Sequence, residues 1–232
     1  QDSLFSVAVE RILSPIAGFF TDFNDGAHDF VLGDFLITRK KDFDTPALHS
    51  PNPYPSPNTD NKTFNFISML RLPIIVKQNG IMSYDEVVLV EPGETGTVFG
   101  NSDFWDFVIV EGSKDFGQTW LPIIDGYDSR ANSTWLTVYN SNISGQDSKA
   151  LGSKDLYINR QFSITANGNF KNGDTILVRF RLFSDPYANG WGWAIDNLRI
   201  QQGVSAVHQP VISPGHLTLW PNPFSDQLYW AY

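Results

Sequence analysis

The sequence predicts an all-β protein, an antiparallel two-sheet jelly-roll sandwich, and three observations support this fold class. Apolar runs of strand length recur along the chain, and turn-forming pairs such as Asn79-Gly80, Asn167-Gly168 and Asn172-Gly173 separate them. The 232 residues include 18 Phe, 8 Tyr and 7 Trp but only 2 Met, a balance that suits pleated sheets better than helices. Within the runs, apolar and polar side chains alternate, as in sheets with one buried face.

The first part of the chain predicts few regular elements. Residues 4–12 alternate and end at Ser14-Pro15, which indicates a short strand or connector. A Gly- and Asp-rich stretch at 21–33 precedes an expected strand at 34–39. Residues 42–62 hold five prolines, so we expect a long surface loop, and loops of this length are commonly functional.

The second part predicts a series of short strands. The runs that indicate them are 64–76, 86–90, 104–110, 120–124, 135–139, 156–164, 175–183 and 193–200. In the run at 175–183, Ile176, Val178, Phe180 and Leu182 alternate with residues that include Arg179 and Arg181. We therefore expect one face of this strand to be buried between two packed sheets.

The composition suggests four segments along the chain. Residues 1–19 form a strand or connector and residues 20–202 the jelly-roll sandwich. Residues 203–216 are rich in Gly, Ser and Pro, which is typical of a linker. Residues 217–232 begin a new apolar segment that is too short to build a core of its own.

Charge and residue usage narrow the classes of partner. The net charge of −9 and the pI of about 4.7 argue against nucleic acid and anionic lipid surfaces as partners. The absence of cysteine excludes disulfides, thiolate metal sites and thiol nucleophiles. No run of about 18 apolar residues is present, so the sequence predicts no transmembrane segment.

The last segment reads Leu217-Thr218-Leu219-Trp220-Pro221-Asn222-Pro223-Phe224-Ser225-Asp226-Gln227-Leu228. It resembles the start of the C-terminal sorting domain of type IX secretion cargo in the Bacteroidota. Trp220 stands where that family usually has Tyr, and 217–232 covers only the beginning of such a domain. The resemblance implies the type IX secretion machinery as a partner, and a secreted or outer-membrane cell-surface location. The alternative is an edge hairpin of the main domain that ends at proline.

Two other segments are similar to jelly-roll modules found beside peptidases and adhesins in such secreted proteins, a group that overlaps the MAM-like sandwiches. Residues 190–200 resemble the closing strand of these modules, and residues 21–26 resemble their opening segment. Residues 113–120 match an Asp-box, S-x-D-x-G-x-T-W, whose role is to stabilise a tight hairpin. The box occurs once, so the sequence does not favour a propeller.

The segments at the two ends of the expected sandwich suggest a structural Ca²⁺. A calcium ion needs six to eight oxygen ligands drawn together from loops. Asp22, Asp25, Asp196 and Asn197 are the candidate ligands, and the ion would tie the first strand to the last. The alternative is that Asp196 and Asn197 only form hydrogen bonds with the backbone at a strand bend.

Aromatic residues near predicted turns suggest a ligand-binding surface. Sugars stack on exposed aromatic faces, while nearby polar side chains bind their hydroxyl groups. The candidate ligand-binding residues are Trp105, Trp135, Tyr187, Trp191, Asp103 and Asn189. The alternative is that each aromatic ring caps the core from a strand end, which is the more common role of such residues.

The sequence offers little support for catalysis. The four histidines show no H-E-x-x-H spacing, and no G-x-S-x-G motif is present. Carboxylates are abundant, but the sequence does not show which of them converge. We therefore expect a non-catalytic extracellular binding or adhesion module whose partner is a glycan or a surface protein. The alternatives are an accessory domain of a larger secreted hydrolase or peptidase and, third, an enzyme that uses a carboxylate pair.

Overall fold

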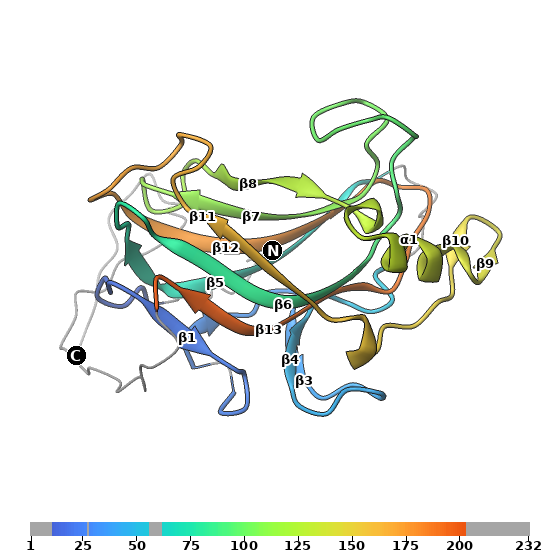
Figure 1. The fold of residues 1–232 in the computed structure, drawn as a ribbon, viewed down its shortest axis with the longest axis horizontal. Coiled ribbons are helices and arrows are strands. Elements are labelled where there is room, and N and C mark those ends of the chain that lie inside the picture. The colour runs from blue at the N-terminus through green and yellow to red at the C-terminus, as the bar shows by residue number, and fades with distance from the viewer. Residues whose placement is uncertain (1–10, 27, 56–61, 203–232) are drawn as a thin grey trace, which may run out of the picture.

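Two packed antiparallel sheets form the body of the protein (Figure 1). The computed structural model describes residues 11–26, 28–55 and 62–202. Within these ranges every pair of neighbouring strands is antiparallel, and the two sheets enclose a shared apolar core. The predicted all-β, two-sheet jelly-roll sandwich is confirmed.

The first sheet has five strands with β12 at its centre. Their spatial order is β2 (Phe30–Val31), β5 (Phe64–Ile75), β12 (Thr175–Ser184), β7 (Phe107–Ser113) and β8 (Leu121–Tyr127). The inward residues of β12, Ile176, Val178, Phe180 and Leu182, are completely buried, whereas Arg179 and Arg181 lie on the outer face. The alternation expected for this strand is confirmed.

The second sheet has six strands with β13 in the middle. Their order is β11 (Ile158–Ser163), β6 (Ile81–Leu89), β13 (Gly192–Ile200), β4 (Ala47–His49) and β3 (Leu36–Thr38), while β1 (Phe19–Thr21) pairs with the last part of β13. Phe19 lies opposite Ile200, and Thr21 lies opposite Leu198. The first and last strands of the sandwich are therefore neighbours.

Large aromatic side chains fill the space between the sheets. The ring centroids of Tyr84, Phe180 and Trp193 lie 5.8 to 6.3 Å apart, in tilted or edge-to-face contacts. Burial of such rings supplies much of the hydrophobic stabilisation of a β-sandwich. One carboxylate, Glu86, lies in this core; it accepts hydrogen bonds from Trp193 Nε1 and Tyr127 Oη, both at 2.8 Å, and pairs with the Arg160 guanidinium.

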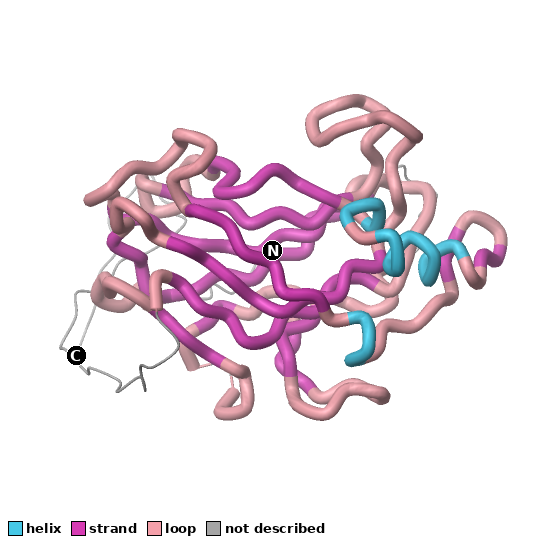
Figure 2. Tube along the Cα trace, in the orientation of Figure 1, coloured by secondary structure: helices cyan, strands magenta, loops and turns pink. Residues whose placement is uncertain are grey.

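The few helical turns gather at one end of the sandwich, near the small β9–β10 hairpin (Figure 2). These elements are η1 (Ser129–Ala131), α1 (Ser133–Asn140), β9 (Ile143–Ser144), β10 (Asp147–Ser148) and η2 (Lys154–Leu156). The strand predicted at 135–139 is wrong, because this segment belongs to α1. The Asn132 side chain caps the helix by accepting from Thr134 N and Trp135 N, and the helical spacing of Trp135 and Tyr139 buries both rings on one face.

The proline-rich segment at 42–62 also differs from its prediction. Its middle contains β4, whose three residues are buried against β13, and Tyr54 is completely buried. Pro46 and Pro51 lie just outside β4, where a missing N–H interrupts no ladder hydrogen bond. The prolines therefore bracket a short strand and do not exclude one.

The Asp-box hairpin between β7 and β8 has the structural role that the sequence predicts. Asp115 accepts from Thr119 N at 2.9 Å and from Thr119 Oγ1 at 2.6 Å, and Ser113 Oγ donates to it at 2.7 Å. Gly117 N donates to Ser113 Oγ at 2.6 Å. The hydrogen bonds from Thr119, followed by the one from Ser113, lower the pKa of Asp115 to about 2.

Several predictions fall on residues that the structure does not describe. The linker at 203–216 and the sorting segment at 217–232 lie outside the described residues, as does most of the connector at 1–19. Among the described residues, no helix is both long and apolar enough to cross a membrane.

Candidate ligand-binding site

A shallow groove of about 430 Å³ lies between β8, η1 and the loop that joins β6 to β7. Its walls are Thr97, Val98, Phe99, Phe104, Asp125, Gly126, Tyr127, Asp128, Arg130 and Ala131. We refer to it as the loop groove. Val98 is 63% exposed and Asp125 is also exposed, so apolar and acidic groups face solvent side by side.

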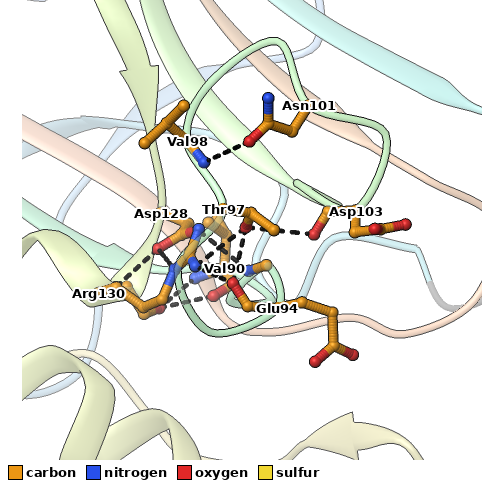
Figure 3. A network of polar contacts seen from close by, with 10 residues as sticks. Val90, Glu94, Thr97, Val98, Asn101, Asp103, Asp128 and Arg130 are labelled. Atoms are coloured by element: carbon orange, nitrogen blue, oxygen red, sulfur yellow. Dashed lines mark hydrogen bonds and ion pairs between the residues drawn. The ribbon is translucent and has the colours of Figure 1, made fainter.

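A polar network holds the β6–β7 loop in place beside the groove (Figure 3). Asp128 accepts from Gly93 N at 3.0 Å and forms an ion pair with Arg130 at 2.7 Å. Arg130 Nη1 also donates to Glu94 O at 2.5 Å and to Thr97 Oγ1 at 3.1 Å. Because Asp128 is buried and Arg130 is mostly buried, these bonds fix the loop before any ligand arrives.

The aromatic rings of the groove pack against one another and against this network. The Arg130 guanidinium lies 5.0 Å from the Phe104 ring centroid, and the Phe99 and Phe104 centroids are 6.2 Å apart. A Cβ atom at Gly126 would lie 2.5 Å from the Phe99 ring, so glycine is needed for this close approach. The result is an aromatic wall that faces polar and acidic groups.

The wall continues onto the outer face of the five-stranded sheet. Phe107 on β7 lies 5.1 Å from Phe99, measured between ring centroids, and stacks on Phe183 of β12 at 4.9 Å. The Arg181 guanidinium lies 5.3 Å from the Phe107 ring, and the Arg179 guanidinium lies 4.2 Å from the Trp120 ring. The two guanidinium groups of β12 thus lie between the Trp120 ring on one side and the Phe107 and Phe183 rings on the other. We call this row, Trp120, Arg179, Arg181, Phe107 and Phe183, the arginine ladder.

One carboxylate serves both arginines of the ladder. Glu111 Oε2 accepts from Arg179 Nε and Arg181 Nε, each at 2.8 Å, and Glu111 Oε1 accepts from Arg181 Nη2 at 2.9 Å. Burial alone would raise the pKa of Glu111, but the hydrogen bonds from Arg181 and Arg179 outweigh it and lower that pKa. Two positive charges therefore face one negative charge on this surface.

A second cluster, of carboxylates alone, lies beyond the loop ends of the strands. One carboxylate oxygen from each of Glu91, Asp106 and Asp185 lies within 4.8 Å of the others. Asp106 is completely buried; it accepts from Tyr54 Oη at 2.5 Å and from Asp185 N at 2.8 Å. Oxygens from three carboxylates are ligands that a hard cation such as Ca²⁺ accepts.

The pKa values of this acidic cluster are raised. Burial and then the charge of Asp185 raise the pKa of Glu91 to about 7. Burial also raises the pKa of Asp106 and of Asp185. Each carboxylate is thus harder to ionise than in water because solvent is excluded, and for Glu91 and Asp106 also because their neighbours are acidic.

Of the four aromatic residues predicted to bind a ligand, two are buried and two are accessible to solvent. Trp135 is 0% exposed and donates from Nε1 to Leu156 O at 2.8 Å, while Trp191 is 6% exposed and stacks on Phe43 with ring centroids 5.8 Å apart. Neither ring has a free face for a sugar, so their predicted role is corrected to core packing. Trp105 is partly exposed and Tyr187 is 53% exposed, and their role in ligand binding stays a prediction.

The two polar candidates also differ. Asp103 is exposed in the β6–β7 loop, where its backbone oxygen accepts from Glu94 N at 2.9 Å. Asn189 is 3% exposed and donates from Nδ2 to Tyr54 O at 2.8 Å, so it holds two segments of the chain together. Only Asp103 is placed where a surface ligand could contact its side chain.

The residues proposed for calcium are not gathered around one point. The charge of Asp22 is the smallest of the causes that act on the pKa of Asp196, whereas Asp25 is exposed in a turn. Asp196 Oδ1 accepts from Asn197 N at 2.7 Å, and Asn197, with φ of 51°, lies at an irregularity in the β13–β6 pairing. Burial raises the pKa of Asp196 to about 6. A Ca²⁺ ion at these residues stays a prediction.

For several residues of the site, the sequence contains a local signal of their position. The Asp-box places Trp120 just before β8, and the alternation of β12 places Arg179 and Arg181 on one face. Both signals were present in the sequence, but no spacing shows that Glu111 lies between the two arginines. Phe99 and Phe104 lie in a loop without periodicity, so sequence reasoning had no basis for placing them.

Comparisons with known proteins give little further information. No protein-family model matches this chain, and no curated protein matches it. Among solved structures, the chain is similar to a carbohydrate-binding module, CBM28, described as specific for non-crystalline cellulose. The identity is 11%, the alignment covers 83% of this chain and 100% of that chain, and the TM-score is 0.48. A likeness of this degree does not indicate a shared ligand.

Proposed function

We propose that this chain is a non-catalytic glycan-binding module that acts outside the cell or at its surface. The observation that carries the proposal is the loop groove, in which the rings of Phe99 and Phe104 lie beside the polar groups of Asp125 and Arg130. Sugars bind to such surfaces because their C–H faces pack on aromatic rings while their hydroxyl groups exchange hydrogen bonds with charged side chains.

The rigidity of the site supports binding more than catalysis. The polar network around Asp128 and Arg130 fixes the β6–β7 loop, which lowers the entropy that ligand binding would otherwise cost. The carboxylates nearest one another, Glu91, Asp106 and Asp185, do not line the groove. A glycan in the groove would therefore be held away from them.

Export is part of the same proposal and rests on the sequence alone. The resemblance of residues 217–232 to a sorting domain supports secretion through the type IX machinery, with a final location at the cell surface or outside it. The similarity of residues 190–200 to modules found beside peptidases supports the related role of an accessory domain in a larger secreted hydrolase or peptidase. In both roles the module would hold its protein on a glycan.

Affinity electrophoresis in gels that contain soluble polysaccharides tests the binding proposal. We expect the protein to be retarded by at least one polysaccharide, and Phe104→Ala to weaken that binding about tenfold, the loss of one aromatic contact. Phe116→Ala is the matched control, because Phe116 is 57% exposed but lies on the Asp-box hairpin outside the groove.

A second variant guards against a folding defect. Asp125 is exposed, so Asp125→Asn should leave the thermal unfolding midpoint unchanged while it alters the hydrogen bonds available to a sugar. Retardation by no polysaccharide, or equal retardation of the wild type, Phe104→Ala and Asp125→Asn, would remove the groove as a glycan site.

A further inference from the structure

The arginine ladder carries more positive charge than its surroundings neutralise. Glu111 is the carboxylate that bonds both Arg179 and Arg181, and the strand neighbours of these arginines on β5 are the uncharged Met69 and Ile67. Besides Glu111, the hydrogen-bond acceptor of Arg181 among the described residues is the neutral Asn65, at 2.9 Å. The local charge of this group is therefore +1, in a chain whose net charge is −9.

Arg179 is the arginine with unused hydrogen-bond donors. Its Nε donates to Glu111, but among the residues that the structure describes its two terminal nitrogens donate to no protein acceptor. Its side chain is 15% exposed, and the guanidinium plane lies against the Trp120 ring at 4.2 Å. The group is thus held in one orientation with two donors free, which is the arrangement that binds a carboxylate or sulfate in a bidentate manner.

The ladder is continuous with the loop groove. Arg179 and Phe183 are four residues apart on β12, a distance of about 14 Å at about 3.4 Å per residue. Phe183 stacks on Phe107, and Phe107 contacts both Phe99 and Phe104 of the groove. A chain-like ligand that occupies the groove would reach Arg179 by following the rings along β12.

We propose that the ligand of this surface is an anionic glycan, and that Arg179, stacked on Trp120, binds its carboxylate or sulfate group. This inference rests on the proposed glycan-binding function and adds the chemical class of the ligand. The net negative charge of the protein does not prevent such binding, because at physiological ionic strength charges farther away than about 8 Å are largely screened.

Affinity electrophoresis and titration calorimetry with three probes test the proposal. The probes are a polyuronate, a sulfated polysaccharide and a neutral polysaccharide of similar length. We expect the polyuronate, the sulfated polymer or both to bind more tightly than the neutral polymer. Binding of the first alone identifies a carboxylate as the recognised group, and binding of the second alone identifies a sulfate.

Variants of Arg179 then locate the site. Arg179→Gln should weaken binding of the anionic probe about tenfold, the loss of one charge-assisted contact. Arg199→Gln is the matched control, because Arg199 lies 4.1 Å above the Phe20 ring on the other sheet and its replacement removes the same charge from the same kind of stack. The control should bind within twofold of the wild type.

Arg179→Lys keeps the charge but not the planar group, so it should retain folding and bind with intermediate affinity. Tighter binding of the neutral probe than of both anionic probes would overturn this inference and leave the glycan-binding proposal intact. Equal loss in Arg179→Gln and Arg199→Gln would also overturn it. Failure of all three probes to bind would instead reject the glycan-binding function itself.

Discussion

The acidic cluster and the arginine ladder are two carboxylate-centred groups with opposite charge imbalance. The cluster brings three carboxylates within 4.8 Å of one another, while the ladder places two guanidinium groups on one carboxylate. The pKa of Glu91 in the cluster is raised, by burial first, and that of Glu111 in the ladder is lowered because bonds from Arg181 and Arg179 outweigh burial. The comparison shows that partners decide the protonation state of a carboxylate as much as burial does.

The carboxylate of Glu86, in the core, has a pKa that can be compared with those of Glu91 and Glu111. Glu86 has one guanidinium partner, Arg160, and two neutral donors, and it is completely buried. Burial raises its pKa even though the Arg160 charge opposes that change. One cation is thus not enough to offset full desolvation here, whereas two cations are enough at the less buried Glu111.

Among substitutions in the acidic cluster and the arginine ladder, we expect the one at Asp106 to lower the stability of the fold most. Asp106→Ala would remove the acceptor for Tyr54 Oη and Asp185 N, both of which would lose a buried hydrogen bond. We expect a loss of about 2–4 kcal/mol in the free energy of unfolding, measured by urea denaturation. Asp106→Asn retains an acceptor and removes the charge, so it should cost much less. Equal losses in the two variants would show that a neutral acceptor cannot replace the carboxylate, and a gain in stability in both would show that charge repulsion governs the cluster.

We expect a smaller loss in the free energy of unfolding when Glu111 is replaced. Glu111→Ala would leave the guanidinium groups of Arg179 and Arg181 next to each other without a shared acceptor. Because both arginines are partly exposed, at 15% and 14%, water compensates in part, and we expect a loss of about 1–2 kcal/mol. Guanidinium chloride should be avoided as denaturant, since its salt would screen the pair. A variant as stable as the wild type would mean that Glu111 positions the arginines without stabilising the fold.

The smallest effect is a dependence of stability on pH that comes from Glu91. Its pKa is about 7 in the folded protein and 4.5 as its usual value, so between these pH values the folded state binds more protons than the unfolded chain. Stability therefore falls as pH rises from about 5 to about 8. After a discount for partial exposure we expect about 1 kcal/mol.

Urea midpoints of the wild type and Glu91→Gln at both pH values measure this effect. The variant should lose most of the pH dependence and be the more stable protein at pH 8. Asp106 and Asp185 have raised pKa values of the same direction, so some dependence should remain. A wild type that becomes more stable toward pH 8 would contradict the assigned direction.

Sequence reasoning predicted the sandwich better than its binding surface. Alternation on β12 and the Asp-box at 113–120 depend on neighbours in sequence, and both predictions are confirmed. The helix at Ser133–Asn140 and the strand at Ala47–His49 were missed, because a single capping residue and a bracketing pair of prolines decided these elements. In a short segment, one helix-capping residue or pairing with one neighbouring strand can thus decide the secondary structure against the local sequence pattern.

The site depended on contacts between distant segments, which no local pattern reveals. Glu111 and Arg181 are 70 positions apart, and Tyr54 and Asp106 are 52 positions apart. The prediction that Trp135 binds a ligand was wrong because an aromatic residue next to a turn can point inward as readily as outward. Nothing in its neighbouring residues shows which of the two occurs.

The pairing of Phe19 with Ile200 determines how the module would be presented. Because these strands are neighbours and antiparallel, the polypeptide enters β1 and leaves β13 at one end, and Figure 1 shows the loops near α1 at the other. A tether attached after β13 would therefore leave the loops near α1 on the side away from the anchor. A part of a longer protein that follows the module could change in size without obstructing access to those loops.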